Sequence, residues 1–273
     1  MFQSILDNVV RIHPLVHSIT NYVTANDCAN ILLACGASPI MADDPLEAAE
    51  ITSACDGLCL NLGTLHSRTI ESMILSGKTA NQKGIPVVFD PVGVGASHFR
   101  TQTASTLLSE LRFSVIRGNM SEIKSLALGT GTTKGVDAAL ADRISDSNLE
   151  EALIFTKNFS RKSGAVTVIT GPVDLVSNET TTFCIRNGIP LMSSVTGTGC
   201  QLSALITAFA AASPNHLLEA AAAAVCVMGL AGELGVKRMT SLDGNASYRN
   251  YIIDAVYNMK PEILEKGARY EMR

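Results

Sequence analysis

Short apolar runs alternate with longer amphipathic stretches along most of the chain. The short runs are rich in β-branched residues and end at polar or glycine-containing turns, whereas the longer stretches have helical spacing. The expected strands are LVHSITN, SPIMA, LCLNLG, IPVVFDPV, FSVIRGN and AVTVITG, followed by a hairpin of VDLVSN and TTTFCIRNG. This alternation predicts an α/β fold with a mostly parallel central sheet and helices on both of its faces.

The intervening stretches predict helices, several of which have end signals. Gly36 and Gly84 follow the last apolar residue of two of them, Pro45 stands near the start of another, and Gly57 follows the end of that one. The expected helices are ANDCANILLACG, DPLEAAEITSACDG, SRTIESMILSGKTANQKG, TQTASTLLSELR, MSEIKSLAL, NLEEALIFTKNFSRKSG and QLSALITAFAAAS.

No tandem repeat or low-complexity linker divides the chain, so residues 1–273 are expected to form a single domain. The loosest part is residues 129–139, GTGTTKGVDAA, which we expect to be a surface excursion. The most apolar part is residues 220–232, AAAAAVCVMGLAG. It is shorter than the roughly 18 apolar residues of a membrane span, and it predicts a helix buried on most sides.

Composition narrows the class of protein. Hydrophobic residues make up 47% of the 273 residues and charged residues only 17%, with a net charge of -4. Neither nucleic acid nor an anionic membrane is therefore an expected partner. The seven cysteines contain no C-x-x-C pair and the chain opens without a signal-peptide pattern, so free thiols in a cytoplasmic enzyme are expected. The low charge also suggests that part of the surface is buried against other subunits.

In a parallel sheet, ligands bind beyond the carboxyl ends of the strands, so the residues that follow each strand are the candidates for chemistry. They are Asn21, Met41, Asn61, Asp90, the segment from Arg117 to Glu122, Thr170, Gly171, and the segment from Gly197 to Cys200.

Three of these stretches have a specific chemical interpretation. Residues 197–200, GTGC, precede a helix, where backbone N–H groups bind anions and where the helix dipole favours a thiolate at Cys200. Asp90 ends an apolar strand and is followed by a glycine-rich turn, so its carboxylate can hold Mg²⁺ beside phosphates. Asn119 and Glu122 open a helix as N-x-x-E. Each stretch also has a purely structural interpretation, as a tight turn or a helix cap.

Two motif-like stretches carry no such interpretation. SGKTA lacks the first glycine of a P-loop, because Ser72 occupies its position, and GTGTTKG has Lys134 where a dinucleotide-binding loop needs its third glycine. The five histidines show no metal-binding spacing.

Taken in order, the three stretches resemble the ribokinase-like kinases, in which the glycine turn is usually G-T-G-D and its aspartate is the base. Cys200 replaces that aspartate here. The N-terminal run HSITNYVTANDCANILLACGASPIMADDPLE, together with DPVGVGAS, RGNMSEI and VTGTGC, is similar to the hydroxyethylthiazole kinase family of thiamine salvage. The resemblance covers nearly the whole chain and implies a three-layer ribokinase-like fold.

The resemblance also implies an activity and a set of roles. The family transfers the γ-phosphate of ATP to the alcohol of 4-methyl-5-(2-hydroxyethyl)thiazole, and its members are homotrimers with active sites between subunits. Carried onto this sequence, the roles are: thiazole binding by Met41, Gly197, Asn21 and Val23; ATP binding by Arg117, Thr170 and Gly199; Mg²⁺ binding by Asp90 and Glu122; and Cys200 as the catalytic residue near the hydroxyl.

Three other functions stay open on the residues alone. A ribokinase-like kinase for a hydroxymethylpyrimidine or for pyridoxal would share most of the motifs, but Met41 and TNYVT argue against it. A nucleotide-binding module without activity is disfavoured because Asp90, Glu122 and the Gly-Thr-Gly turn are all present. A cysteine hydrolase that uses Cys200 would need a partner base, and no histidine is obviously placed for it.

Overall fold

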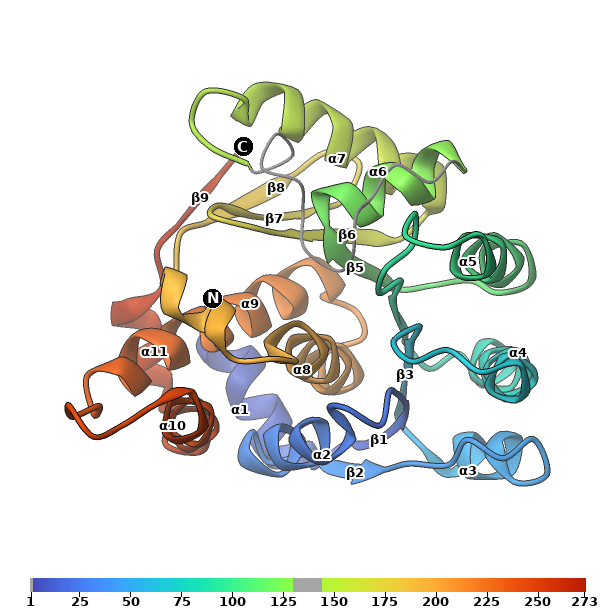
Figure 1. Cartoon of the computed structure of the whole chain (residues 1–273), viewed down its shortest axis with the longest axis horizontal. Helices are drawn as coiled ribbons and strands as arrows, with labels where there is room; N and C mark the ends of the chain where they lie inside the picture. The colour runs from blue at the N-terminus through green and yellow to red at the C-terminus, as the bar shows by residue number, and fades with distance from the viewer. Residues whose placement is uncertain (1, 130–143) are drawn as a thin grey trace.

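A computed structural model describes residues 2–129 and 144–273. Its centre is a nine-stranded sheet in the order β2-β1-β3-β4-β5-β6-β7-β8-β9 (Figure 1). Strands β1 to β6 run parallel and β7 to β9 are added antiparallel. The strands are β1 Leu15–Ile19, β2 Ser38–Ile40, β3 Gly57–Asn61, β4 Val87–Asp90, β5 Val115–Asn119, β6 Val166–Thr170, β7 Asp174–Ser177, β8 Thr182–Ile185 and β9 Tyr270–Met272.

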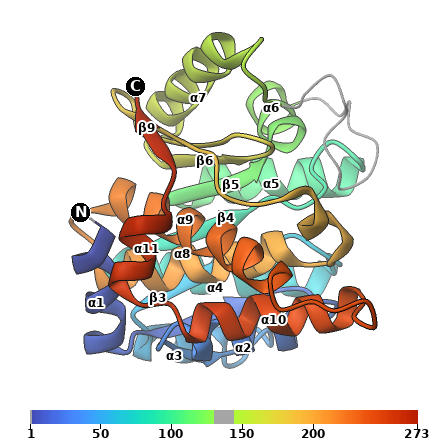
Figure 2. The same ribbon diagram turned by 90° about the vertical axis from the view of Figure 1, so that its left-hand side faces the viewer.

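Helices cover both faces of the sheet, as the alternation predicted (Figures 1 and 2). One layer consists of α3 Ala48–Ala54, α4 Ser67–Lys83, α5 His98–Glu110, α6 Met120–Leu128 and α7 Leu149–Ser163. The other consists of α1 Phe2–Ile12, α2 Ala25–Ala34, α8 Thr198–Ala212, α9 Leu217–Val236, α10 Asn245–Tyr257 and α11 Pro261–Gly267, with a short 3-10 helix at Pro190–Ser194.

The sheet separates two apolar cores because its strands are buried on both sides. All five residues of β3 and all four of β4 are buried, which explains why these strands read as continuous apolar runs. Alternate strand residues face opposite cores: Val88 packs with α8 and α9, while Val87 and Phe89 pack with α4 and α5.

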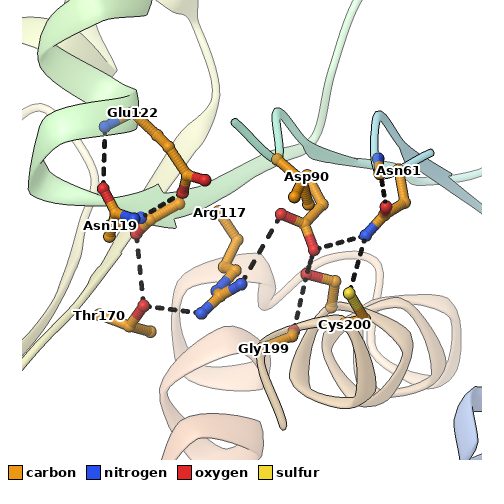
Figure 3. A network of polar contacts seen from close by, with 12 residues as sticks. Asn61, Asp90, Arg117, Asn119, Glu122, Thr170, Gly199 and Cys200 are labelled. Carbon is orange, nitrogen blue, oxygen red and sulfur yellow. Dashed lines mark hydrogen bonds and ion pairs between the residues drawn. The ribbon is translucent and has the colours of Figure 1, made fainter. Parts of the chain in front are cut away.

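The register of the parallel strands brings the expected site residues side by side. Asn61 at the end of β3 is paired with Asp90 at the end of β4, and Asn119 at the end of β5 is paired with Thr170 at the end of β6. Helix α8 begins at the same edge of the sheet, so its first turn faces these strand ends (Figure 3).

Helix α9 is longer than the apolar stretch that predicted it. It spans 20 residues and is long and apolar enough to cross a membrane, but 78% of its apolar window is buried inside the protein. Every residue from Ala220 to Gly232 is buried. Burial, rather than length, therefore identifies α9 as a core helix.

The structure also differs from the expectation at the helix predicted over DPLEAAEITSACDG, and α8 begins at Thr198, three residues earlier than predicted. Helix α3 covers only Ala48–Ala54, and Gly57 does not end it but begins β3. The physical reason is the close approach of α8: a Cβ on Gly57 would lie 3.0 Å from a methyl group of Thr207 and 3.2 Å from Cβ of Ala211. By contrast, Gly84 ends α4 as expected, in the left-handed conformation.

Among the described residues, five elements had no counterpart in the sequence analysis: α1, α10, α11, β9 and the 3-10 helix at Pro190–Ser194. Of the loose segment at residues 129–139, all but Gly129 lies outside the described residues.

Candidate active site

The site is built around Asp90, which is fully buried at the end of β4. Its Oδ2 accepts hydrogen bonds from Asn61 Nδ2 at 2.8 Å and from Ser203 Oγ at 2.7 Å. Its Oδ1 has no hydrogen-bond partner among the described residues and lies 3.6 Å from Arg117 Nη1 (Figure 3). Burial raises the pKa of Asp90, while the Arg117 charge and the two hydrogen bonds lower it. The carboxylate is thus held firmly through Oδ2, while Oδ1 contacts only the charge of Arg117 among the described residues.

Arg117 connects Oδ1 of Asp90 to the expected phosphate-binding residues. Its Nη2 donates to Thr170 Oγ1 at 2.7 Å. Its guanidinium lies against the backbone of Gly199, where any Cβ would collide with it. The three residues expected to bind ATP, Arg117, Thr170 and Gly199, therefore do lie together, at the N-terminus of α8 (Figure 3). A cation beside free backbone N–H groups is a favourable site for phosphate.

Glu122 caps its own helix and also contacts the glycine-rich turn. A capping box joins it to Asn119: the Glu122 N–H donates to Asn119 Oδ1 at 2.9 Å, and Glu122 Oε2 accepts the Asn119 N–H at 2.8 Å. Its Oε1 accepts the Gly93 N–H at 2.8 Å. Burial raises the pKa of Glu122 to about 7, and the Asp90 charge adds to this, whereas the backbone hydrogen bonds and Arg117 oppose it. Glu122 can therefore serve both as the cap of its own helix and as a candidate ligand for Mg²⁺.

These carboxylates fit a Mg²⁺ ion that arrives with a nucleotide. The described residues contain no group of three or more histidine, cysteine or acidic side chains that could enclose a metal by themselves. Mg²⁺ in phosphoryl-transfer sites is usually held by one or two carboxylates, with phosphate and water oxygens completing its shell. The buried Oδ1 of Asp90, which makes no hydrogen bond among the described residues, is a suitable ligand. Each oxygen of Glu122 keeps lone pairs beyond its single backbone hydrogen bond.

Cys200 lies in the first turn of α8 and is partly exposed, whereas the other six cysteines are buried. Its sulfur accepts hydrogen bonds from Asn61 Nδ2 at 3.3 Å and from Asn21 Nδ2 at 3.4 Å. The expected preference for a thiolate is not found in the free protein. Burial raises the pKa of the Cys200 thiol and the Asp90 charge raises it further, outweighing the hydrogen bonds with Thr24 and Asn21 and the charge of Arg117.

The residues expected to bind thiazole divide into two pairs. Asn21 is buried and reaches Cys200, and Gly197 immediately precedes α8 with a positive φ of 83°. Met41 and Val23 follow β2 and β1, their side chains are 37% and 55% exposed, and as apolar residues they take no part in the hydrogen-bonded network.

Two residues of the network were not assigned a role from the sequence. The sequence predicts Asn61 only as a strand-end residue, although its pairing with Asp90 follows from the parallel register. Ser203 was not noted; it lies one helical turn after Cys200, so the spacing could have suggested that both face the sheet.

A model of the hydroxyethylthiazole kinase family matches residues 6–262. The chain belongs to this family. A hydroxyethylthiazole kinase of Clostridium acetobutylicum is 57% identical over 271 residues, which is 99% of each chain. One of Ruminiclostridium cellulolyticum is 50% identical over 94% of this chain and 92% of the relative. The expected family and enzyme class are therefore confirmed.

Solved structures confirm the expected fold. A structure of a hydroxyethylthiazole kinase family protein from Pyrococcus horikoshii superposes with a TM-score of 0.88 at 34% identity, covering 100% of this chain and 98% of that one. Pyridoxal kinase of Staphylococcus aureus, solved in complex with pyridoxal, superposes with a TM-score of 0.63 at 14% identity, covering 95% and 97%. At that identity the second likeness concerns the fold alone.

Proposed function

We propose that this chain transfers the γ-phosphate of ATP to the hydroxyl of 4-methyl-5-(2-hydroxyethyl)thiazole. The observation that carries this proposal is the position of Asp90, with one oxygen fixed by Asn61 and Ser203 and the other beside Arg117. The relatives named above are hydroxyethylthiazole kinases, and this arrangement supplies what phosphoryl transfer needs: a fixed carboxylate, a cation and a helix N-terminus.

The phosphate side of the proposed site consists of Arg117, Thr170 and Gly199. Arg117 would release Asp90 and turn toward the transferring phosphate, while Thr170 and the N–H of Gly199 hold phosphate oxygens. Mg²⁺, held by Asp90 and Glu122 together with the nucleotide, would neutralise the charge that builds on those oxygens. Thr170 and Gly199 already lie beside Arg117, so apart from the turn of the Arg117 guanidinium little reorganisation is needed.

The alcohol side of the proposed site consists of Asn21, Val23, Met41 and Gly197 around the thiazole, with Cys200 nearest its hydroxyl. The alcohol must lose a proton as the phosphoryl group is transferred. Cys200 occupies the position of a base, but the raised pKa of its thiol means that it is protonated at neutral pH. The thiol can therefore orient the alcohol as a hydrogen-bond partner, and the proton of the alcohol is accepted only in the fraction of molecules that holds the thiolate.

ADP release with a panel of alcohols tests the proposed substrate. Hydroxyethylthiazole should give the highest kcat/KM among hydroxyethylthiazole, hydroxymethylpyrimidine and pyridoxal, and activity should require Mg²⁺. A higher kcat/KM with either other alcohol would contradict the substrate assignment while leaving the kinase assignment in place.

Two further properties belong to the proposal. We expect a homotrimer, as the family resemblance implies, and the apolar residues Tyr22, Val23 and Leu46, which are 73%, 55% and 93% exposed in the loops after β1 and β2, are candidates for its interface. We also expect a cytoplasmic location, since all seven cysteines are free thiols.

A further inference from the structure

Asn61 is the most fully bonded side chain at the strand ends. It ends β3, is 1% exposed, and uses both amide atoms twice. Its Oδ1 accepts the Gly63 N–H at 2.8 Å and Asn21 Nδ2 at 3.1 Å. Its Nδ2 donates to Asp90 Oδ2 at 2.8 Å and to Cys200 Sγ at 3.3 Å. A buried amide with no remaining capacity has a single orientation.

The direction of these hydrogen bonds follows from the backbone. The Gly63 N–H can only donate, so the oxygen of Asn61 must face it and the nitrogen must face Asp90 and Cys200. The same reasoning applies to Asn21, whose oxygen accepts the Thr24 N–H at 3.1 Å. Both amides therefore present N–H groups to the sulfur, which is an acceptor of two hydrogen bonds.

Asn61 thus connects the two halves of the proposed site. One N–H of its amide fixes the carboxylate proposed to hold the metal, and the other reaches the sulfur proposed to contact the alcohol. Ser203 also donates to Asp90 Oδ2, at 2.7 Å, but has no recorded bond to the sulfur among the described residues. Of these two partners of Asp90, Asn61 is the one that reaches both groups.

We infer that Asn61 is a positioning residue that fixes the Cys200 sulfur and the Asp90 carboxylate relative to each other, so that alcohol and phosphate meet in line. This inference rests on the roles proposed above for Asp90 and Cys200. If Asn61 had only a structural role, its hydrogen bond to Asp90 would connect β3 with β4, and its removal would not change the reactivity of the Cys200 sulfur.

The first experiment is a double-mutant cycle. Asn61→Leu keeps the shape of the side chain and removes all four hydrogen bonds. We expect kcat to fall about 10- to 100-fold, as for loss of hydrogen bonds to charged or reacting groups, with a much smaller change in the KM for ATP. Combined with Cys200→Ala, the loss should be clearly smaller than the product of the two single losses. Multiplicative losses would overturn the inference.

The second experiment measures the reactivity of Cys200 and not enzyme activity. Its result therefore tests the role of Asn61 even if the proposed substrate is wrong. Iodoacetamide should label Cys200 alone in the folded protein, because the other six cysteines are buried. In Asn61→Leu the pH midpoint of labelling, followed by mass spectrometry, should move upward, since a donor to the thiolate is lost. Ser203→Ala, which removes the other hydrogen bond to Asp90 Oδ2, is the matched control and should move it much less.

Asn61→Asp covers the case in which Asn61→Leu does not fold. It keeps the acceptor for the Gly63 N–H but replaces the donating nitrogen with a second negative oxygen. Labelling of Cys200 at pH 8 should slow by about tenfold or more, because the added charge opposes the thiolate. Labelling at the wild-type rate and midpoint in either folded variant would overturn the inference.

Discussion

Cys200 shows how competing physical effects act on one residue. Its place in the first turn of a helix and its two amide donors favour the thiolate, but burial and the charge of Asp90 raise its pKa. The net direction could not be predicted from GTGC, because the sequence of a turn does not reveal how deeply its side chain is buried. The thiol is the resting form at neutral pH.

This resting form leads to a prediction about the pH dependence of the reaction. If Cys200 accepts the proton of the alcohol, kcat of the wild-type protein should rise as pH increases toward and beyond 9, where more thiolate forms. Cys200→Asp should reach its plateau at lower pH, because a carboxyl group ionises more readily. Cys200→Ser should lose this pH dependence and show a kcat lower on the order of 10²–10⁴-fold.

Kinetics between pH 6 and 10 check this prediction, with circular dichroism to show that each variant is folded. A folded Cys200→Asp without activity at any pH would exclude the role as a base. A covalent intermediate on the sulfur, trapped by mass spectrometry, would replace that role with nucleophilic catalysis.

Gly197 is required for two separable reasons. Its φ of 83° lies in the left-handed region, which costs a residue with a side chain about 1–2 kcal/mol, and a Cβ there would also collide with the methyl group of Thr24. We expect Gly197→Ala to lower both Tm and kcat/KM. The double variant with Thr24→Ser should recover the steric part, since serine keeps the hydroxyl that bonds to Asn21.

Gly84→Ala is the matched control for Gly197→Ala. Gly84 has a similar φ of 73°, but nothing lies within 4 Å of an added Cβ. Gly84→Ala should therefore lower Tm less than Gly197→Ala does in thermal unfolding experiments. Equal losses of stability in Gly197→Ala and Gly84→Ala would show that the Thr24 side chain moves away from the added methyl group without destabilising the protein.

The sequence predicted the strand-end residues well but not the bonds between them. Asp90 and Thr170 end β4 and β6, so their common edge follows from parallel strands alone, whereas Arg117 lies inside β5 and does not follow it as predicted. The contacts of Asn61 with Cys200 depend instead on how close α8 lies to β3, which Gly57 permits and which no periodic pattern encodes.

Among the elements, strand β7 begins with a titrating carboxylate, that of Asp174. Asp174 Oδ1 accepts the Gly171 N–H at 2.9 Å, and burial raises the pKa of Asp174 to about 7, with the hydrogen bond and Arg117 opposing. Because its pKa is raised on folding, its contribution to stability is fully present below the unfolded pKa, about 3.8, and is lost as pH rises through about 7.

Asp174→Asn should therefore change the pH dependence of stability. Asparagine keeps the acceptor for the Gly171 N–H and cannot ionise, so the variant should lose less stability than the wild-type protein between pH 4 and pH 7. Urea unfolding at several pH values measures this. Parallel curves for the two proteins would show that Asp174 is not ionising in that range.

The elements that escaped the sequence analysis have different causes. Helix α1 does carry its apolar residues on one face, at Phe2, Ile5, Leu6 and Val9, so its pattern was readable. Strand β9 has only three residues, none of them buried, and it exists because β8 offers an open edge. Such a strand is a consequence of tertiary structure and has no signal of its own.

At the scale of the whole molecule, the proposed trimer should be sensitive to charge on its exposed apolar loops. Leu46→Glu, before α3, should lower the mass measured by light scattering from near three times 28.8 kDa toward that of one chain, and activity should fall with it. Ile154→Glu is the control: Ile154 is 62% exposed on α7, at the other end of the molecule from α3 (Figure 1). An active wild-type monomer would contradict the inter-subunit site.

Helix α9 has a consequence for how this chain can change over evolutionary time. Most helices have an outer face on which substitutions accumulate freely, so tolerance to substitution repeats every three to four residues. From Ala220 to Gly232 no such face exists, because every residue is enclosed by neighbouring helices and the sheet. The five consecutive alanines leave no space for a larger side chain on any side. This segment should therefore accumulate substitutions more slowly than the rest of the chain. Among related sequences, its substituted positions should not recur every three to four residues.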